Sequence, residues 1–469
     1  MTGIKRLIGD KAFYKLVFTV TIPIIIQNGI TNFVSLLDNI MVGRVGTEPM
    51  SGVSIANQLL FVFNLCIFGG LSGVGIFTAQ FHGSHDEEGV RRTLRFKIIV
   101  AALICVIGIT VFLTWGLPLI NLYLQGDEDV GNVAVTAGYG LDYLKIMVLG
   151  LVPFALTQVY ASTLRETGDT VPPMVASIIS VITNMVLNYI LIFGHLGFRP
   201  LGVEGAAIAT VIARWLEAGY LVLHVHTSPK RYPYIRGAYR SLYVPKALCG
   251  DIIRRGMPLL ANELLWSVGT TYMIQCYSLR GLSVIAALNI SSTVSNFFFI
   301  AFQAMGSAVA ILVGQQLGAG EYKEARHTAE KLIFFSAASC VVLGGVLALF
   351  APYIPNLYNT SDTVRHLATK LLYDVAICMP IFSFAHCTYF TIRSGGKTVL
   401  TFLVDSAYTW LFSVPLVYVL IHFTDMNIVP LYLITQASDS LKCVIGFILV
   451  RKGVWVNNIV ADKGTEKIA

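Results

Sequence analysis

Residues 16–41 read LVFTVTIPIIIQNGITNFVSLLDNIM, an apolar run that carries an aspartate, Asp38, near its end. A transmembrane helix needs about 20 mostly apolar residues, and this run is long enough. A carboxylate inside such a helix costs about 2.5–3.5 kcal/mol on insertion scales, so an ionisable residue there is a functional candidate. The stretch therefore predicts a membrane-spanning helix that also carries a functional group.

The composition of the whole chain is that of a polytopic membrane protein. Of its 469 residues, 55% are hydrophobic and 13% are charged, and the mean hydropathy is +0.71; soluble domains carry about 25% charged residues. We expect an all-α protein with twelve transmembrane helices, because twelve runs have the length and apolarity of a span. They are 16–41, 52–81, 98–118, 138–163, 172–194, 204–226, 257–279, 284–313, 332–352, 369–392, 399–422 and 429–450.

The basic residues predict the orientation of the chain. With a cytoplasmic N-terminus, most of the 33 Lys and Arg residues fall in cytoplasmic segments, above all around Arg91–Lys97 and in the connector 227–256. Cytoplasmic loops are enriched in Lys and Arg, so we expect both termini in the cytoplasm and the chain in a plasma membrane, the inner membrane of a prokaryote. This distribution places the excess basic residues behind the net charge of +7 next to the anionic lipid of the inner leaflet. No nucleic-acid motif is present, so we expect no nucleic-acid partner.

The two halves of the chain repeat one another. A shift of 235 positions superposes Pro23 on Pro258, Gln80 on Gln315, Gly83 on Gly318 and Arg91 on Arg326. We therefore expect six-helix lobes at 1–226 and 257–469, the latter with a cytoplasmic tail, joined by the connector 227–256. Repeats with an even number of spans are related by an axis along the membrane normal, with the substrate path between them.

No segment outside these runs is long enough for a soluble catalytic domain. The glycine-containing stretch GQQLGAGEYKEAR at 314–326 lacks the Lys-Ser/Thr ending of a phosphate-binding loop. We therefore expect a protein that is not an enzyme and binds no cofactor. A transporter of this kind must use an ion gradient, a partner or the substrate gradient itself.

Five motifs resemble those of the multidrug and toxic compound extrusion (MATE) family, in the same order. They are DNIMVGRVGTEPMSGVSIANQ at 38–58, RETGDTVPPM at 165–174, NMVLNYILIFG at 184–194, GVEGAAIAT at 202–210 and GQQLGAGEYKEAR at 314–326. The resemblance covers residues 12–450. It implies a twelve-span antiporter that exports organic, mostly cationic and amphipathic compounds in exchange for Na⁺ or H⁺.

The resemblance also implies a cation or proton site in the first lobe. Asp38 matches the family's first-span aspartate, Asn184 and Asn188 match its fifth-span polar pair, and Thr210 matches the hydroxyl that completes the group. Asn188 departs from the archaeal members, which have an aspartate there.

Elementary chemistry favours the same group. Asn184 and Asn188 are four residues apart, so they project from one helix face. A carboxylate, two amides and a hydroxyl offer hard oxygen ligands that suit Na⁺, by analogy with other hard cations. Alternatively, removal of Asp38 from water favours the neutral acid, so the group would bind a proton.

The second lobe departs from the family pattern. Trp266 stands where the NorM-like branch has a glutamate, and Phe382 and Ser383 stand in the region of its tenth-span aspartate. Glu263 lies one turn before Trp266 on roughly the same face, so we expect it to be a substrate or second ion group. Its counterpart in the first half is Asn28. Other polar or aromatic candidates for the substrate path are Gln27, Gln158, Tyr272 and Asn289.

The sequence thus predicts an antiporter for small organic compounds that works by alternating access, with one chain forming the functional unit. One alternative is a flippase for lipid-linked oligosaccharides, which would favour a basic central cavity; the spans hold only Lys145, Arg214 and Lys442 as unusual cations. Another is a non-transporting receptor, although no large segment lies outside the bilayer to display a ligand. The exported compound and the choice between Na⁺ and H⁺ stay open.

Overall fold

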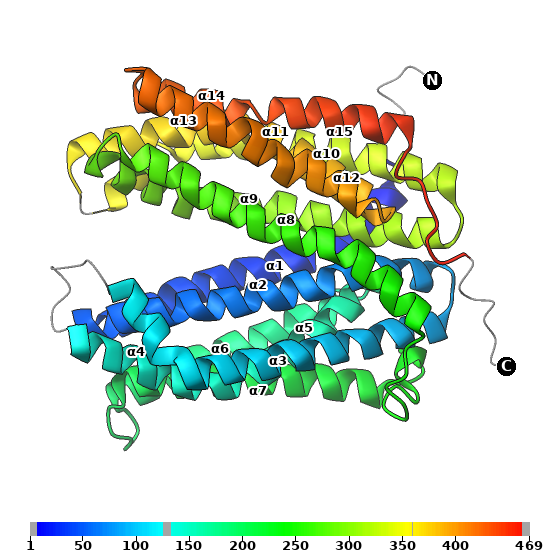
Figure 1. Ribbon diagram of the computed structural model, residues 1–469, viewed down its shortest axis with the longest axis horizontal. Coiled ribbons are helices and arrows are strands. Elements are labelled where there is room, and N and C mark those ends of the chain that lie inside the picture. Colours follow the sequence, from blue (N-terminus) through cyan, green and yellow to red (C-terminus); the bar gives the residue numbers. More distant parts are fainter. Residues whose placement is uncertain (1–6, 125–132, 359, 462–469) are drawn as a thin grey trace. The chain divides into compact units, whose positions relative to one another are not determined.

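The computed structural model describes residues 7–124, 133–358 and 360–461, and within these ranges all regular secondary structure is helical (Figure 1). The first half contains α1 (Lys11–Gly43), α2 (Thr47–Gly83), α3 (Glu87–Leu124), α4 (Val133–Met147), η2 (Val148–Gly150), α5 (Leu151–Glu166), α6 (Val171–Phe193) and α7 (Gly202–Thr227). The connector contains the short 3₁₀ helix η3 (Pro233–Ile235).

The second half contains α8 (Lys246–Ser278), α9 (Leu282–Gly318), α10 (Tyr322–Phe350), η4 (Ile354–Leu357), α11 (Asp362–Ser394), α12 (Thr398–Phe402), η5 (Leu403–Ala407), η6 (Thr409–Ser413), α13 (Val414–Phe423), α14 (Ile428–Ala437) and α15 (Ser440–Lys452). The segments η5 and η6 are π-helical and join α12 to α13 in one run. In lipid the backbone must satisfy its own hydrogen bonds, which continuous helices do.

The helices agree with the twelve predicted spans. Among the described residues, eleven helical runs are long and apolar enough to cross a membrane. The twelfth predicted span lies in α8, which is helical over 33 residues but less apolar because the span itself carries Asn262, Glu263 and Gln275. The predicted fold class, an all-α polytopic membrane protein, is confirmed.

The chain forms two compact units. Unit 1 contains Met1–Ile25, Ala79–Asp86 and Gly250–Ala469, and unit 2 contains Ile26–Thr78 and Glu87–Cys249. Helix α1 therefore belongs to unit 1 up to Ile25 and to unit 2 from Ile26 onward. The lobes predicted from the repeat follow chain order. In the structure, the start of the chain and the end of α2 belong to unit 1, together with the second half of the chain.

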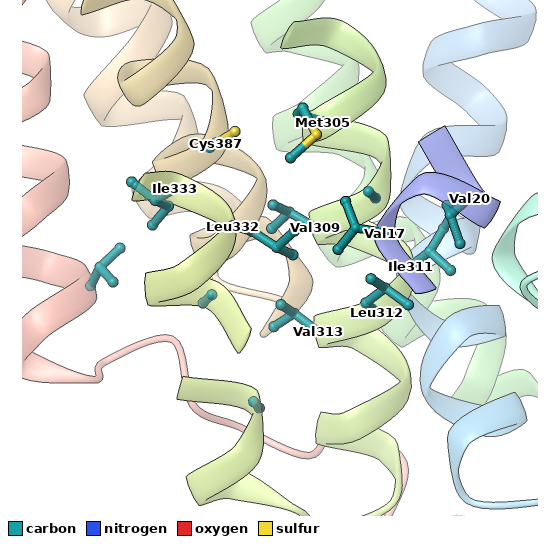
Figure 2. Packing of buried hydrophobic residues seen from close by; sticks show 14 of the residues in the cluster. Val17, Val20, Met305, Val309, Ile311, Leu312, Val313, Leu332, Ile333 and Cys387 are labelled. Carbon is teal, nitrogen blue, oxygen red and sulfur yellow. The ribbon is translucent and has the colours of Figure 1, made fainter. Parts of the chain in front are cut away.

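Each unit is a bundle of packed helices. In unit 2, α7 contacts α4, α5 and α6, and α3 contacts α4 and α5. In unit 1, α11 contacts α9, α10, α14 and α15. Figure 2 shows the apolar core of unit 1, where Val17 of α1 lies with Val309 of α9 and Leu332 of α10, all fully buried. Because lipid is as apolar as these side chains, close van der Waals packing holds such helices together.

The two repeats meet reciprocally inside unit 1. A side-chain carbon at Gly83 would overlap the Gln315 carbonyl, and one at Gly318 would overlap the Gln80 carbonyl. Gln315 and Gly318 are the repeat counterparts of Gln80 and Gly83. A pair of equivalent contacts of this kind is what a local two-fold relation produces.

The fully buried Gln80 side chain ties three backbone groups to this crossing. Its Nε2 donates to the carbonyls of Ser394 at 2.9 Å and Asn457 at 3.2 Å, and its Oε1 accepts from the Ile459 amide at 2.8 Å. The segment after α15 is thereby held against the end of α2. Sequence comparison of the repeats marks Gln80 as a matched position, but its partners are visible only in the structure.

We expect Gln80→Leu to lower the thermal unfolding temperature of the purified protein. The change removes the Gln80 bonds to two carbonyls and one amide, and each of these groups left unsatisfied costs about 1–3 kcal/mol. Gln58→Leu is the matched control, because Gln58 lies on the same helix with an exposed side chain. An equal unfolding temperature for the two variants would contradict the role of Gln80.

Candidate functional site

Four predicted site residues form one chain of hydrogen bonds in unit 2. Asn188 Nδ2 donates to Asp38 Oδ1 at 2.6 Å and to Asn184 Oδ1 at 3.0 Å. Asn184 Nδ2 donates to Thr210 Oγ1 at 3.1 Å, and Thr210 Oγ1 donates to the Ala206 carbonyl at 3.0 Å. The structure thus brings together side chains from α1, α6 and α7.

The local sequence explains how these helices approach so closely. Helix α7 begins with GVEGAAIAT, and its small residues Gly205, Ala206 and Ala209 are buried. A side-chain carbon at Gly205 would lie 2.7 Å from the Leu191 carbonyl of α6. Small residues allow two membrane helices to come into backbone contact, and this contact places Thr210 beside Asn184.

Two members of the group are buried and the other two, Asp38 and Thr210, are half-buried. Asn184 is 5% exposed and Asn188 is 1% exposed. Among the described residues, no Lys, Arg or His nitrogen lies within ion-pair distance of Asp38, whose hydrogen-bond partner is the neutral Asn188 amide. Within the same residues, Asn188 Oδ1 is buried without a hydrogen-bond partner. The site therefore combines a carboxylate with an unused buried oxygen acceptor.

Tyr143 of α4 is a neighbour that sequence reasoning missed. Its hydroxyl donates to Asn57 Oδ1 at 3.4 Å, and it interacts with the Thr210 side chain. The Tyr143 side chain is 6% exposed. A single tyrosine in an apolar run carries no positional signal, so only the packing of α4 against α7 reveals it.

The remaining first-half candidates lie outside this chain of hydrogen bonds. Gln27 Nε2 donates to Ser177 Oγ at 2.9 Å, and Ser177 Oγ donates to Glu217 Oε1 at 2.9 Å. Asn28 on α1 and Gln158 on α5 are half-buried. Gln27 thus ties α1 to α6 and α7 at a second point, on the unit 2 side of Ile25.

The second-half candidates belong to unit 1 and do not form one group. Glu263 is half-buried on α8, where Arg393 and Asp405 act on it electrostatically with opposite signs. Tyr272 packs against an apolar cluster that includes Cys276 and Leu288, and Asn289 is exposed on α9. Their link to a substrate path stays a prediction.

A charged group in unit 1 was not predicted. Asp405 of η5 and Asp439 at the start of α15 both lie beside Lys442. Asn262, the residue before Glu263, donates to Asp405 Oδ2 at 3.0 Å. Both aspartates lie within predicted spans, so the signal that singled out Asp38 could have found them.

The comparisons with known proteins identify a family twice over. The family model MatE matches residues 23–190 and again residues 258–419, so each half of the chain matches it separately. The two matches begin at Pro23 and Pro258, which are counterparts in the repeat.

Similar proteins cover nearly the whole chain. A probable multidrug resistance protein YoeA of Bacillus subtilis is 27% identical over 433 residues, which is 90% of each chain. A probable multidrug resistance protein NorM of Thermotoga maritima is 21% identical over 94% of this chain and 93% of its own. Two solved structures share the fold. A MATE in the bent conformation has a TM-score of 0.84 over 97% of each chain and 18% identity. An outward-facing multidrug resistance MATE family transporter has a TM-score of 0.82 over 97% of this chain and 98% of its own, and 19% identity.

We expect Asp38→Ala and Asn188→Ala to be coupled in a double-mutant cycle of unfolding free energies. Polar contacts between membrane helices contribute about 0.6–2 kcal/mol, so the interaction free energy should fall in that range. The control pair is Asn28→Ala with Asn188→Ala, because Asn28 lies on the same helix outside the hydrogen-bonded chain. Additive effects for Asp38 and Asn188 would refute their contact.

Proposed function

Since the chain belongs to the MatE family of multidrug efflux transporters, we propose that it is a secondary active antiporter that exports cationic, amphipathic organic compounds in exchange for Na⁺ or H⁺. The observation that carries this proposal is the Asp38 carboxylate, which lies in a span and, among the described residues, has the neutral Asn188 amide as its hydrogen-bond partner. A carboxylate in such surroundings favours the binding of a positive charge.

Either coupling ion fits the donor and acceptor atoms of the group. For Na⁺, the oxygens of Asp38, Asn184, Asn188 and Thr210 are hard ligands close to one another. For H⁺, the protonated Asp38 carboxyl has an O–H that can donate a hydrogen bond. Asn188 Oδ1 is a buried acceptor without a partner among the described residues. In both cases the charge of the site changes by one, which is the event that coupling requires.

Helix α1 offers the route from the ion to the rest of the molecule. Asp38 lies on the part of α1 that belongs to unit 2, whereas the residues up to Ile25 belong to unit 1. Pro23 lies inside the helix just before that boundary, and proline is where a helix bends most readily. Ion binding at Asp38 would then change the equilibrium between two arrangements of α1, and coupling follows when substrate prefers the other one.

Orientation and functional unit follow from the same proposal. The chain is a multi-pass membrane protein, and we place it in the plasma membrane with both termini in the cytoplasm. Arg95 of α3 supports this orientation, because its guanidinium binds the carbonyls of Gly237 and Ala238 and so holds the basic connector at one end of unit 2. One chain holds both repeats, so we expect it to work as a monomer on small organic substrates, without a resident cofactor.

We expect Asp38→Asn to abolish gradient-driven efflux while the protein still inserts and folds. Asparagine keeps the size of the side chain but cannot exchange a proton or balance a cation. The measurement is accumulation of a fluorescent organic cation, such as ethidium, in everted vesicles with an imposed ion gradient.

The matched control for this experiment is Asp362→Asn, because the Asp362 side chain is 87% exposed at the start of α11. It should transport at the wild-type rate. Wild-type transport by Asp38→Asn, at equal protein levels in the membrane, would refute the proposed coupling site.

The two ions are separated by imposing each gradient alone on reconstituted vesicles. If Na⁺ drives transport at equal pH on both sides, Asn184→Leu should lose ion drive, because one ligand oxygen is removed. If a pH gradient drives transport without Na⁺, Asn184→Leu should keep it, because the acid and its Asn188 partner remain. Transport indifferent to both gradients in the wild-type protein would exclude an ion-coupled antiporter.

A further inference from the structure

Unit 1 contains a buried ammonium group with a complete set of partners. Lys442 is 8% exposed, and its Nζ lies 3.3 Å from Asp405 Oδ1, 3.4 Å from Asp439 Oδ1 and 3.5 Å from Thr409 Oγ1. An ammonium has three N–H donors, and three acceptors surround it. The Tyr408 ring adds a cation–π contact, with Nζ 5.2 Å from the ring centroid. These are the groups that would otherwise bind a free cation.

The carboxylate beside Lys442 is fixed in place by its own backbone and by α8. Asn262, 2% exposed, donates to Asp405 Oδ2 at 3.0 Å. In return, Asn262 Oδ1 accepts from the amide of Ser406 at 3.2 Å and from its hydroxyl at 2.7 Å. Asp405 lies in the π-helical segment η5, and such segments occur most often where a side chain must be presented at a particular point.

Charge is balanced around these residues. Asp439 is at the N-terminus of α15, where the positive end of the helix dipole also favours a carboxylate. Arg393, 8% exposed, acts electrostatically on Glu263 and lies over the Phe390 ring at 5.1 Å. Asp405 and Asp439 therefore share one fixed cation. Among the described residues, Asp38 in unit 2 and the buried Asp374 of α11 have no cation within ion-pair distance.

We propose that Lys442 is a tethered cation that permanently occupies Asp405 and Asp439, so that these two carboxylates of the second lobe bind no coupling ion. This inference rests on the proposed antiport and specifies which carboxylates take no part in it. Lys442 acts here as a specificity-determining residue: it excludes Na⁺ or H⁺ from Asp405 and Asp439.

The test is the number of driving ions bound by the purified full-length protein. The probe is ²²Na⁺ in equilibrium binding if the sodium gradient drives transport, and proton uptake measured by potentiometric titration if the pH gradient does. We expect Lys442→Met to bind about one ion more per chain than the wild-type protein binds. The added ion should persist in the Asp38→Asn/Lys442→Met double variant, relative to Asp38→Asn alone, and disappear in Asp405→Asn/Lys442→Met.

Two further variants keep the test decisive if Lys442→Met does not fold. Lys442→Arg keeps the tethered charge and should bind as many ions as the wild-type protein. Asp405→Asn alone should also bind as many, because Asp405 is already occupied by Lys442 in the native chain. A lower ion count in Asp405→Asn would overturn the inference, as would a folded Lys442→Met protein that gains no ion.

Failure of this inference and failure of the proposed function look different. A wild-type protein that binds one ion through Asp38, with no gain in Lys442→Met, contradicts only the role of Lys442. A wild-type protein that binds no ion and ignores both gradients contradicts the antiport and this inference together.

Discussion

A carboxylate inside a membrane protein must be balanced by a proton, a bound cation or a fixed positive charge, because an isolated buried charge is very costly. The two units meet this constraint in different ways. Asp38 in unit 2 is held by the Asn188 amide, so its balancing charge must come from outside the protein. Asp405 in unit 1 is paired with Lys442, which belongs to the chain itself. The first arrangement can exchange its cation, and the second cannot.

This difference gives α1 its importance. The helix carries the one carboxylate of the four-residue group and passes from unit 1 to unit 2 between Ile25 and Ile26. On the unit 2 side it is tied twice, through Gln27 to Ser177 and through Asp38 to Asn188. In the second tie the ionisable group is on α1 itself, whereas in the first it is Glu217 of α7, reached through Ser177. The Gln27 contact can therefore persist while the contact at Asp38 is remade, so that a local change of charge acts on one end of the helix.

The sequence could predict the fold because membrane solvation leaves few alternatives. Twelve apolar runs of sufficient length must become helices, and the 235-residue repeat, which the family model matches twice, divides them into two sets. It could also predict the Asp38 group, since an intramembrane carboxylate and two asparagines at helical spacing stand out in apolar surroundings. It could not predict Tyr143 or Asn262, because a lone polar residue in a span has no signal beyond its contacts. The pairing of Asp405 with Lys442 required the packing of η5 against α15, which no local pattern records.

The pairing of Asp405 with Lys442 gives a physical meaning to the departures from the family pattern. Trp266 and Phe382 stand where the NorM-like branch carries acidic residues in its second lobe, while Glu263 and Asp374 lie on the same two helices, α8 and α11. In this chain, Asp405 on η5 and Asp439 before α15 share the cation Lys442. Carboxylates held in such an internal ion pair keep a stable polar interior without binding an ion. The repeated frame then supports unequal chemistry in its two copies, because Asp38 has a neutral partner where Asp405 and Asp439 have a cation of the chain itself.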